Sequence, residues 1–288
     1  MIQLYKENSC FQELKQEWLK LLRHSSMDTI FLTPVWLETW WAVFGHKRGE
    51  LAIITVRDQK ASLIAIAPFF IYQEGGQKVA HLLGEPDLCD YGNFIIRSGY
   101  EEEVLPQILR SMRELLPWDR LEIYGVPEES VVFANMQILQ KNNGLKMQEE
   151  FLDNCPFVIL PATWDQYLEE LRPKDRHELR RKLRRWEKQG DTSWYLTHAL
   201  ERLLADLEAF LSLHSGSKTE KERFMDESRR EFFFHLGRKL FEEGWLYLSF
   251  LEKGGQKIAS YFCIDYNGTI NVYNSGFDLK FSDLSPGV

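Results

Sequence analysis

The same order of apolar and polar segments occurs twice in the chain, and this repetition constrains the fold more than any other feature. In each half, amphipathic helices precede an apolar strand, a short polar turn and a longer apolar strand. The hairpin strands are predicted at residues 51–56 and 63–72 in the first half, and at 245–251 and 258–266 in the second. Because a repeated unit of this kind indicates a structural duplication, we predict two similar domains.

The domain boundary is predicted near residue 153. A length of 288 residues suits two domains of ordinary size. An apolar stretch at 155–160 closes with Pro161 and is interpreted as a strand, after which the helical pattern starts again. We therefore predict an N-terminal domain at 1–153 and a C-terminal domain at 154–288. Helices alternate with strands in both, so the predicted fold class is α/β, with mixed α+β sheets.

Each half also contains a third strand beside a polar segment. In the first half the segment Asp90-Tyr91-Gly92-Asn93 leads into a strand at 93–96. In the second half the corresponding segment is Tyr273-Asn274-Ser275-Gly276. The first half then continues with four further predicted elements: a helix at 104–115, a strand at 120–124, a helix at 132–139 and a strand at 145–150.

Composition excludes several classes of protein. Hydrophobic residues make up 44% of the chain and charged residues 27%, as in average globular proteins, which excludes disordered, collagen-like and coiled-coil chains. The 35 Lys and Arg stand against 43 Asp and Glu, and the net charge of −8 argues against DNA and against general binding to anionic membranes. A local basic patch is compatible with this balance.

Cysteine usage and hydropathy indicate a cytoplasmic protein. The four cysteines are scattered and form no CxxC pair, so neither disulfides nor a metal site is expected. The first residues lack a leader pattern, and the longest apolar run, 63–72, is too short to span a bilayer. We therefore expect no transmembrane segment.

A basic run from Arg172 to Lys188 reverses the charge of the chain locally. It would suit the phosphates of a ligand, and Arg176 and Arg180 are the best candidates for such contacts. The alternative is a solvated helix face paired with acidic residues.

A possible phosphate site lies near the end of the sequence. It consists of Asn274-Ser275-Gly276 and the helix-start pattern Ser285-Pro286-Gly287. The unpaired amides of a helix N-terminus favour an anion. The alternative is that the Ser-Pro-Gly stretch merely begins a helix.

Six segments together resemble the GNAT-like acyltransferases. They are most similar to the cellulose-biosynthesis CelD-like group, whose double-GNAT architecture is similar to that of the FemAB peptidyltransferases. The resemblance implies two tandem GNAT-like domains. In that family the segment that corresponds to Ser285-Pro286-Gly287 is followed by a helix and strands. The resemblance therefore also implies that the second domain is incomplete and that the chain is inactive alone. The segments are FLTPVWLETWW, CDYGN, CPFVILPATWDQYLEELRPKDRHELRRKLRRWEKQG, LHSGSK, KIASYFCIDYNGT and YNSGFDLKFSDLSPG.

The resemblance implies acyl transfer from acetyl-CoA or another acyl-CoA to an amine, without a metal. Backbone amides of residues 273–276 would polarise the thioester carbonyl, and Tyr273 would protonate the departing thiolate. Ser285, Pro286 and Gly287 would bind the pyrophosphate. For Tyr273 the alternative is a strand aromatic packed in the core.

Five further residues are candidates for the acceptor side. His214 matches a histidine of the family pattern and is a candidate general base, although a histidine that satisfies backbone carbonyls at a helix end is equally common. Asp278 is a candidate for binding or deprotonating the amine. Asp90, Tyr91 and Lys218 are candidate substrate-binding residues, and such loop positions are also ordinary turn formers.

Three functions remain open at this stage. The first is an N-acyltransferase acting on an amino sugar or a related small-molecule precursor of an exopolysaccharide or of the cell envelope. The second is a FemAB-like transferase that uses charged tRNA. The third is a non-catalytic partner of a polysaccharide-synthesis complex.

Overall fold

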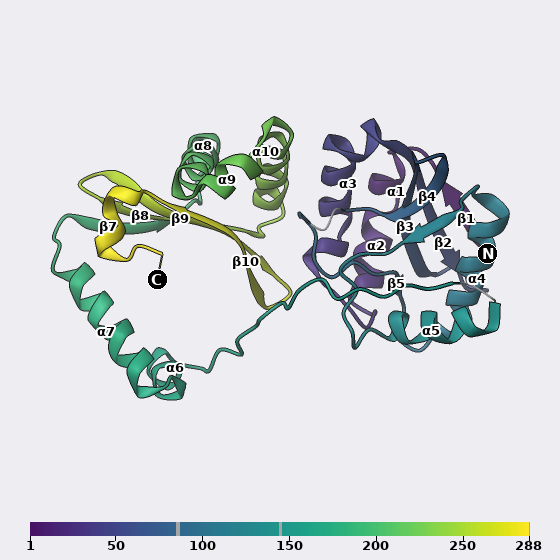
Figure 1. Cartoon of the computed structure of the whole chain (residues 1–288), viewed down its shortest axis with the longest axis horizontal. Coiled ribbons are helices and arrows are strands. Elements are labelled where there is room, and N and C mark those ends of the chain that lie inside the picture. Colours follow the sequence, from purple (N-terminus) through teal and green to yellow (C-terminus); the bar gives the residue numbers. More distant parts are fainter. Residues whose placement is uncertain (85–86, 144–145, 288) are drawn as a thin grey trace. The chain divides into compact units, whose positions relative to one another are not determined.

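The computed structural model describes residues 1–84, 87–143 and 146–287. The chain divides into two compact units, unit 1 at Met1–Phe151 and unit 2 at Leu152–Val288. Each unit contains one β-sheet with helices packed on it (Figure 1). The fold is therefore mixed α/β, as the sequence predicted.

Unit 1 is built on a six-stranded sheet. Its strands follow the order β1-β2-β3-β4-β6, in which β6 runs parallel to β4 and the other neighbours are antiparallel, while β5 pairs with β3. Its elements are β1 (Ile2–Tyr5), α1 (Cys10–Glu13), α2 (Lys15–Leu22), η1 (Ile30–Leu32), α3 (Pro34–Val43), η2 (Gly45–Lys47), β2 (Gly49–Arg57), β3 (Leu63–Glu74), β4 (Gln77–Leu82), β5 (Ile95–Ile96), α4 (Glu101–Leu115), β6 (Arg120–Glu122) and α5 (Val131–Asn143).

Both faces of this sheet are covered, which explains the uninterrupted apolar sequences of β2 and β3. Helix α2 packs on β3, and α4 packs on β2. Alternate residues such as Ala52, Ile54 and Phe69 join the α4 residues in one core cluster. The entry to α3 is set by Thr33, whose hydroxyl accepts a hydrogen bond from the Trp36 amide at 3.3 Å, with Pro34 as the first helical residue.

Unit 2 contains a four-stranded antiparallel sheet in the order β10-β9-β8-β7. Helices α8 and α10 pack on one face of it (Figure 1). Because only one face of the sheet is covered by these helices, buried residues alternate with less buried ones in the middle of β8, whereas β2 has an unbroken run of buried residues. Its elements are α6 (Trp164–Glu170), α7 (Pro173–Glu187), β7 (Thr192–Leu196), α8 (Leu200–Ser217), α9 (Thr219–Phe224), α10 (Glu227–Glu242), β8 (Leu246–Lys253), β9 (Gln256–Tyr266), β10 (Thr269–Phe277) and η3 (Leu279–Leu284).

The two sheets share one topology. In unit 1 the helices α1 to α3 lie between β1 and the antiparallel strands β2-β3-β4, and in unit 2 the helices α8 to α10 lie between β7 and β8-β9-β10. The predicted hairpins occupy corresponding central places. Strand β4 was not predicted, because it is short and polar at its start. It pairs with β3 at Phe69–Glu74, and β5 pairs with the same strand at Ala65 and Ile66.

Two predicted strands are absent from the described residues. Residues 155–160 have no regular secondary structure, and neither do residues 146–150; positions 144 and 145 lie outside the described residues. An apolar run becomes a strand only when a neighbouring strand pairs with it, and a periodicity argument does not test for that neighbour. None of the helices in the described ranges is long and apolar enough to cross a membrane.

Candidate functional site

The most irregular point in the unit 2 sheet is a β-bulge in β10. Val272 pairs with Cys263 and Asn274 pairs with Phe262, so Tyr273 is an extra residue in the ladder. Strand β10 is also the first in the sheet order and has a neighbour on one side only among the described residues. Alternate N–H groups of an edge strand point away from its neighbour. The bulge therefore combines an interrupted ladder with outward-facing donors.

The bulge directs two successive side chains toward the helices. The ring of Tyr273 lies 5.6 Å from that of Phe233 on α10 and 6.1 Å from that of Phe262 on β9, measured between centroids. The side chain of Asn274 forms a hydrogen bond with His214 on α8. In a regular strand these neighbours would face opposite sides of the sheet, so the extra residue is what brings both to α8 and α10.

His214 is buried, with 1% of its surface exposed. Its ring lies 5.9 Å from the Phe210 ring and 6.1 Å from the Phe224 ring. Its Nδ1 has no hydrogen-bond partner, although it is buried. Burial and, to a smaller extent, the nearby Lys221 cation lower the pKa of His214 to about 4, and the Asn274 bond opposes both effects. The imidazole is thus neutral near pH 7 and has one nitrogen available.

Lys221, on α9, is a member of this site that the sequence analysis missed. Its Nζ donates a hydrogen bond to the backbone carbonyl of Ser275. Burial lowers its pKa, and the neighbouring Lys218 adds to the effect. The predicted residue, Lys218, lies one helical turn earlier and is exposed. The predicted HSGSK segment was close to the right place, but α9 was not predicted.

We call His214, Lys221, Tyr273, Asn274 and Gly276 the β10 cluster. It presents a neutral imidazole, a cation at a strand carbonyl and an aromatic hydroxyl beside a bulged edge strand. This combination suits a reaction in which a proton leaves a nucleophile while a carbonyl group is polarised.

Other predicted residues of unit 2 lie apart from this cluster. Asp278 caps η3, where its carboxylate accepts hydrogen bonds from the Lys280 amide at 3.0 Å and from the Gln256 side chain at 3.1 Å. Among the described residues no hydrogen bond joins Asp278 to the β10 cluster. Its proposed role with the acceptor amine remains a prediction.

The prediction of Ser285 as a helix N-cap is wrong for the described structure. Ser285 follows η3 as its C-cap and has the left-handed conformation, with φ 54° and ψ 52°, whereas an N-cap is extended. Pro286 lines a cavity of about 160 Å³ together with Trp194. The carbonyl of Gly287 accepts a hydrogen bond from the Tyr261 hydroxyl at 2.9 Å. A role of these residues at the pyrophosphate stays a prediction.

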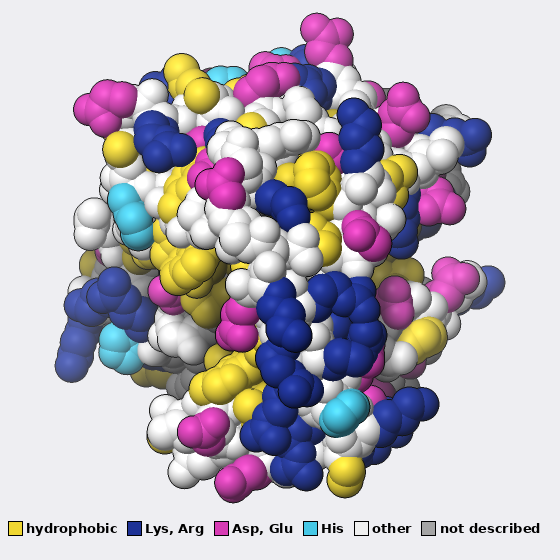
Figure 2. All heavy atoms as spheres, turned by 90° about the vertical axis from the view of Figure 1, so that its left-hand side faces the viewer, with side chains coloured by type: hydrophobic (Ala, Val, Ile, Leu, Met, Phe, Trp, Pro, Cys, Tyr) yellow, Lys and Arg dark blue, Asp and Glu magenta, His cyan; other side chains and the backbone are white. Residues whose placement is uncertain are grey.

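Arg176 and Arg180 lie on α7, which has no buried residue. Figure 2 shows Lys and Arg side chains gathered in a band on the side that carries α7. Neither residue has a carboxylate partner among the described residues, whereas Arg181 pairs with Glu178 at 2.7 Å. The alternative interpretation, a helix face whose basic side chains pair with acidic residues, therefore applies only to part of α7.

Asp90 and Tyr91 belong to unit 1, in the loop between β4 and β5. Tyr91 has φ 54°, and its ring centroid lies 6.1 Å from that of Phe31. Gly92 is required here, because a β-carbon would stand 2.1 Å from the Tyr124 carbonyl oxygen. Cys89 accepts a hydrogen bond from the Trp36 indole at 3.0 Å. Cys89, Tyr91 and Gly92 are thus packed in unit 1, whereas Asp90 is exposed.

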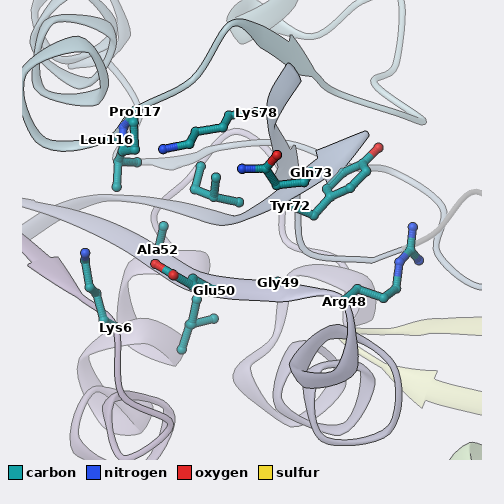
Figure 3. Close-up of a pocket in the computed structure, with 12 residues that line it drawn as sticks. Lys6, Arg48, Gly49, Glu50, Ala52, Tyr72, Gln73, Lys78, Leu116 and Pro117 are labelled. Carbon is teal, nitrogen blue, oxygen red and sulfur yellow. The ribbon is translucent and has the colours of Figure 1, made fainter. Parts of the chain in front are cut away.

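Unit 1 also contains a cavity of about 310 Å³ on the sheet (Figure 3). Lys6, Glu50 and Lys78 line it, together with Leu116 and Pro117 after α4. None of its lining residues was predicted as a catalytic or binding residue. No group of three His, Cys, Asp or Glu side chains in the described ranges is arranged to hold a metal ion.

Residues 173–288 match the family model described as an acetyltransferase (GNAT) domain. This segment includes β7 to β10, the bulge and the β10 cluster. Unit 2 therefore carries a GNAT-type acetyltransferase domain. No curated protein sequence matches the chain.

Comparison with solved structures extends the likeness to the whole chain. The chain is similar to FemX, with a TM-score of 0.65 and 12% identity, over 100% of this chain and 83% of that one. It is also similar to a conserved protein of unknown function from Bacteroides thetaiotaomicron VPI-5482, with a TM-score of 0.53 and 15% identity, over 97% and 81% of the two chains. The fold is FemX-like, in agreement with a tandem GNAT-like architecture. The narrower CelD-like assignment stays a prediction.

Proposed function

We propose that unit 2 transfers an acyl group from acetyl-CoA or another acyl-CoA to a primary amine at the β10 cluster. One observation supports this most strongly: a buried, neutral imidazole with an unpartnered Nδ1 lies beside the bulge of an edge strand in a GNAT-type domain. Acyl transfer from a thioester needs a proton acceptor and carbonyl-polarising amides close together.

In the proposed reaction the amine nitrogen attacks the thioester carbonyl carbon, a C–N bond forms and the C–S bond breaks. Attack makes the nitrogen positively charged and acidic, so that a weakly basic His214 is able to take its proton. Tyr273 gives its hydroxyl proton to the departing thiolate, and solvent returns the two catalytic groups to their starting states. Outward amides of β10 stabilise the carbonyl oxygen. In the same proposal the CoA phosphates contact Arg176, Arg180 and Ser285–Gly287, and the acceptor contacts Lys218 and Asp278. The substrate-binding roles of Asp90 and Tyr91 in unit 1 stay predictions.

Amino sugars are the first acceptors to test, because the sequence resemblance implies them. Release of free thiol from acetyl-CoA in the presence of such an amine would support acyl transfer, and it would contradict the expectation from the resemblance that the chain is inactive alone. His214→Gln should lower kcat by about 100-fold or more, since a proton acceptor contributes on this scale. The matched control is His235→Gln, because His235 is an exposed histidine of α10. Full activity of His214→Gln would contradict the assignment.

The donor is tested separately by calorimetry. We expect CoA to bind, and Gly287→Asp to weaken binding, because a carboxylate there repels the pyrophosphate. Charged tRNA is the competing donor: its tight binding, with no affinity for CoA, would favour an aminoacyl transferase. The absence of transfer with every donor and amine would favour a non-catalytic partner of a larger complex.

A further inference from the structure

Four consecutive apolar side chains of unit 2 are exposed to solvent. Phe157 is 81% exposed, Val158 66%, Ile159 80% and Leu160 71%. They belong to the segment that was predicted as a strand and has no regular structure. A contiguous apolar patch of this kind on a folded protein is unusual and indicates a surface that binds another apolar surface.

An aromatic pair follows this segment directly. Trp164 and Tyr167 lie on α6 with their ring centroids 5.5 Å apart, and Trp164 is 53% exposed. Trp and Tyr are enriched at the boundary between lipid and water, because each has an apolar ring and a polar group. Along the chain the pair lies between the exposed apolar segment and α7.

Helix α7 adds strong positive charge to the same stretch of chain. Residues 172–188 contain nine Lys and Arg and three Asp and Glu, which is a net charge of +6 on a chain of net charge −8. Lys174, Arg184 and Lys188 have no carboxylate partner among the described residues. The dark blue band in Figure 2 shows Lys and Arg side chains gathered on the side that carries α7. Such a surface is complementary to an anionic one.

We propose that residues 157–188 form a peripheral membrane-binding surface that docks on anionic phospholipid. The apolar segment and the aromatic pair enter the boundary between headgroups and acyl chains, and α7 contacts lipid phosphates. Basic residues alone would fit a nucleic acid, and apolar residues alone would fit a protein groove. Their direct succession, with an aromatic pair between them, favours a charged lipid interface. Arg176 and Arg180, the proposed CoA contacts, lie on the same helix, so the tests below use other residues.

The test is co-sedimentation of the full chain with vesicles of phosphatidylcholine alone, or with phosphatidylglycerol as about a third of the lipid. We expect binding to the anionic vesicles only, and weaker binding as salt rises, because ions screen the attraction. Phe157→Ser with Ile159→Ser should weaken binding about tenfold, and both positions are exposed, so the fold should persist. Circular dichroism checks this.

The charge contribution is tested with Lys174→Glu and Arg184→Glu together, which should abolish binding. The matched control is Arg23→Glu with Lys47→Glu, the same change at exposed positions of unit 1. Three results would overturn the proposal: no binding of the wild-type chain to anionic vesicles, equal binding by the wild type and all three double variants, or binding of tRNA without binding of vesicles. The last result would assign α7 to nucleic acid.

Discussion

Gly276 of β10 lies directly against the backbone of His214 on α8. A β-carbon at Gly276 would stand 2.2 Å from the His214 backbone nitrogen and 2.5 Å from its Cα atom. Only glycine allows this approach, because backbone atoms within a helix cannot move aside cheaply. The contact sets the distance between the bulged strand and the buried imidazole, and so determines the geometry of the β10 cluster.

We expect Gly276→Ala to lower the free energy of unfolding by about 1–3 kcal/mol, as overpacking of a close contact does. Urea unfolding measures the change. Gly216→Ala is the matched control, since Gly216 lies on α8 and a β-carbon there meets nothing within 4 Å. That control should be neutral or stabilising by about 0.5–1 kcal/mol, because glycine weakens a helix. Equal effects of both substitutions would show that the contact is unimportant.

His214 makes stability depend on pH in a defined interval. Its pKa in the folded state is about 4, below its ordinary value of 6.5, so the unfolded state binds the proton more readily. The contribution of the neutral His214 to the free energy of unfolding is complete above pH 6.5. It is lost as the pH falls toward 4, by roughly 3 kcal/mol in total. Unfolding of the wild type and of His214→Gln across this interval measures the difference. If the stabilities of the two proteins changed in parallel with pH, His214 would not be the source of the pH dependence.

Lys221 and Asn274 should shift the titration of His214 in opposite directions. Removing the cation in Lys221→Met should raise the pKa of His214, and removing the hydrogen bond in Asn274→Ala should lower it. NMR titration of the imidazole protons measures both. Shifts of the same sign would mean that both substitutions act by changing the burial of His214, and that the two contacts do not determine its pKa.

A second polar cluster in unit 2 has a structural role. The buried Asp206 carboxylate accepts hydrogen bonds from Lys257 at 2.6 Å, from Thr197 at 2.8 Å and from Tyr195 at 2.9 Å. These bonds hold the pKa of Asp206 below its ordinary value although burial opposes them. Its contribution is present above the unfolded pKa and is lost as pH falls through the folded one.

We expect Asp206→Ala to cost about 3 kcal/mol, because it leaves Lys257 and two hydroxyl groups without their acceptor. Thermal or urea unfolding gives the value. Glu208→Ala is the control, since Glu208 lies on the same helix and forms a more exposed pair with Arg230. A loss for Asp206→Ala no greater than that of the control would show that solvent replaces the partners.

Much of the architecture follows from local patterns in the sequence. Helical spacing placed α3, α4 and α8, and the polar turns 57–60 and 252–256 divided the hairpins, because these features depend on neighbours within a few residues. The place of His214 near the end of an amphipathic helix was also predicted from the sequence, and its catalytic role stays a prediction.

Tertiary structure decided the rest. The approach of Gly276 to His214 and the bond from Lys221 to Ser275 join residues more than 50 positions apart in the chain. The bulge at Tyr273 depends on how β10 pairs with β9. Residues 155–160 have strand-like composition and no strand pairing, since pairing requires a partner edge that no local pattern contains. The sequence by itself determined two repeated α/β units and a basic helix. Only packing between distant segments, where backbone atoms meet, determined which side chains form the site.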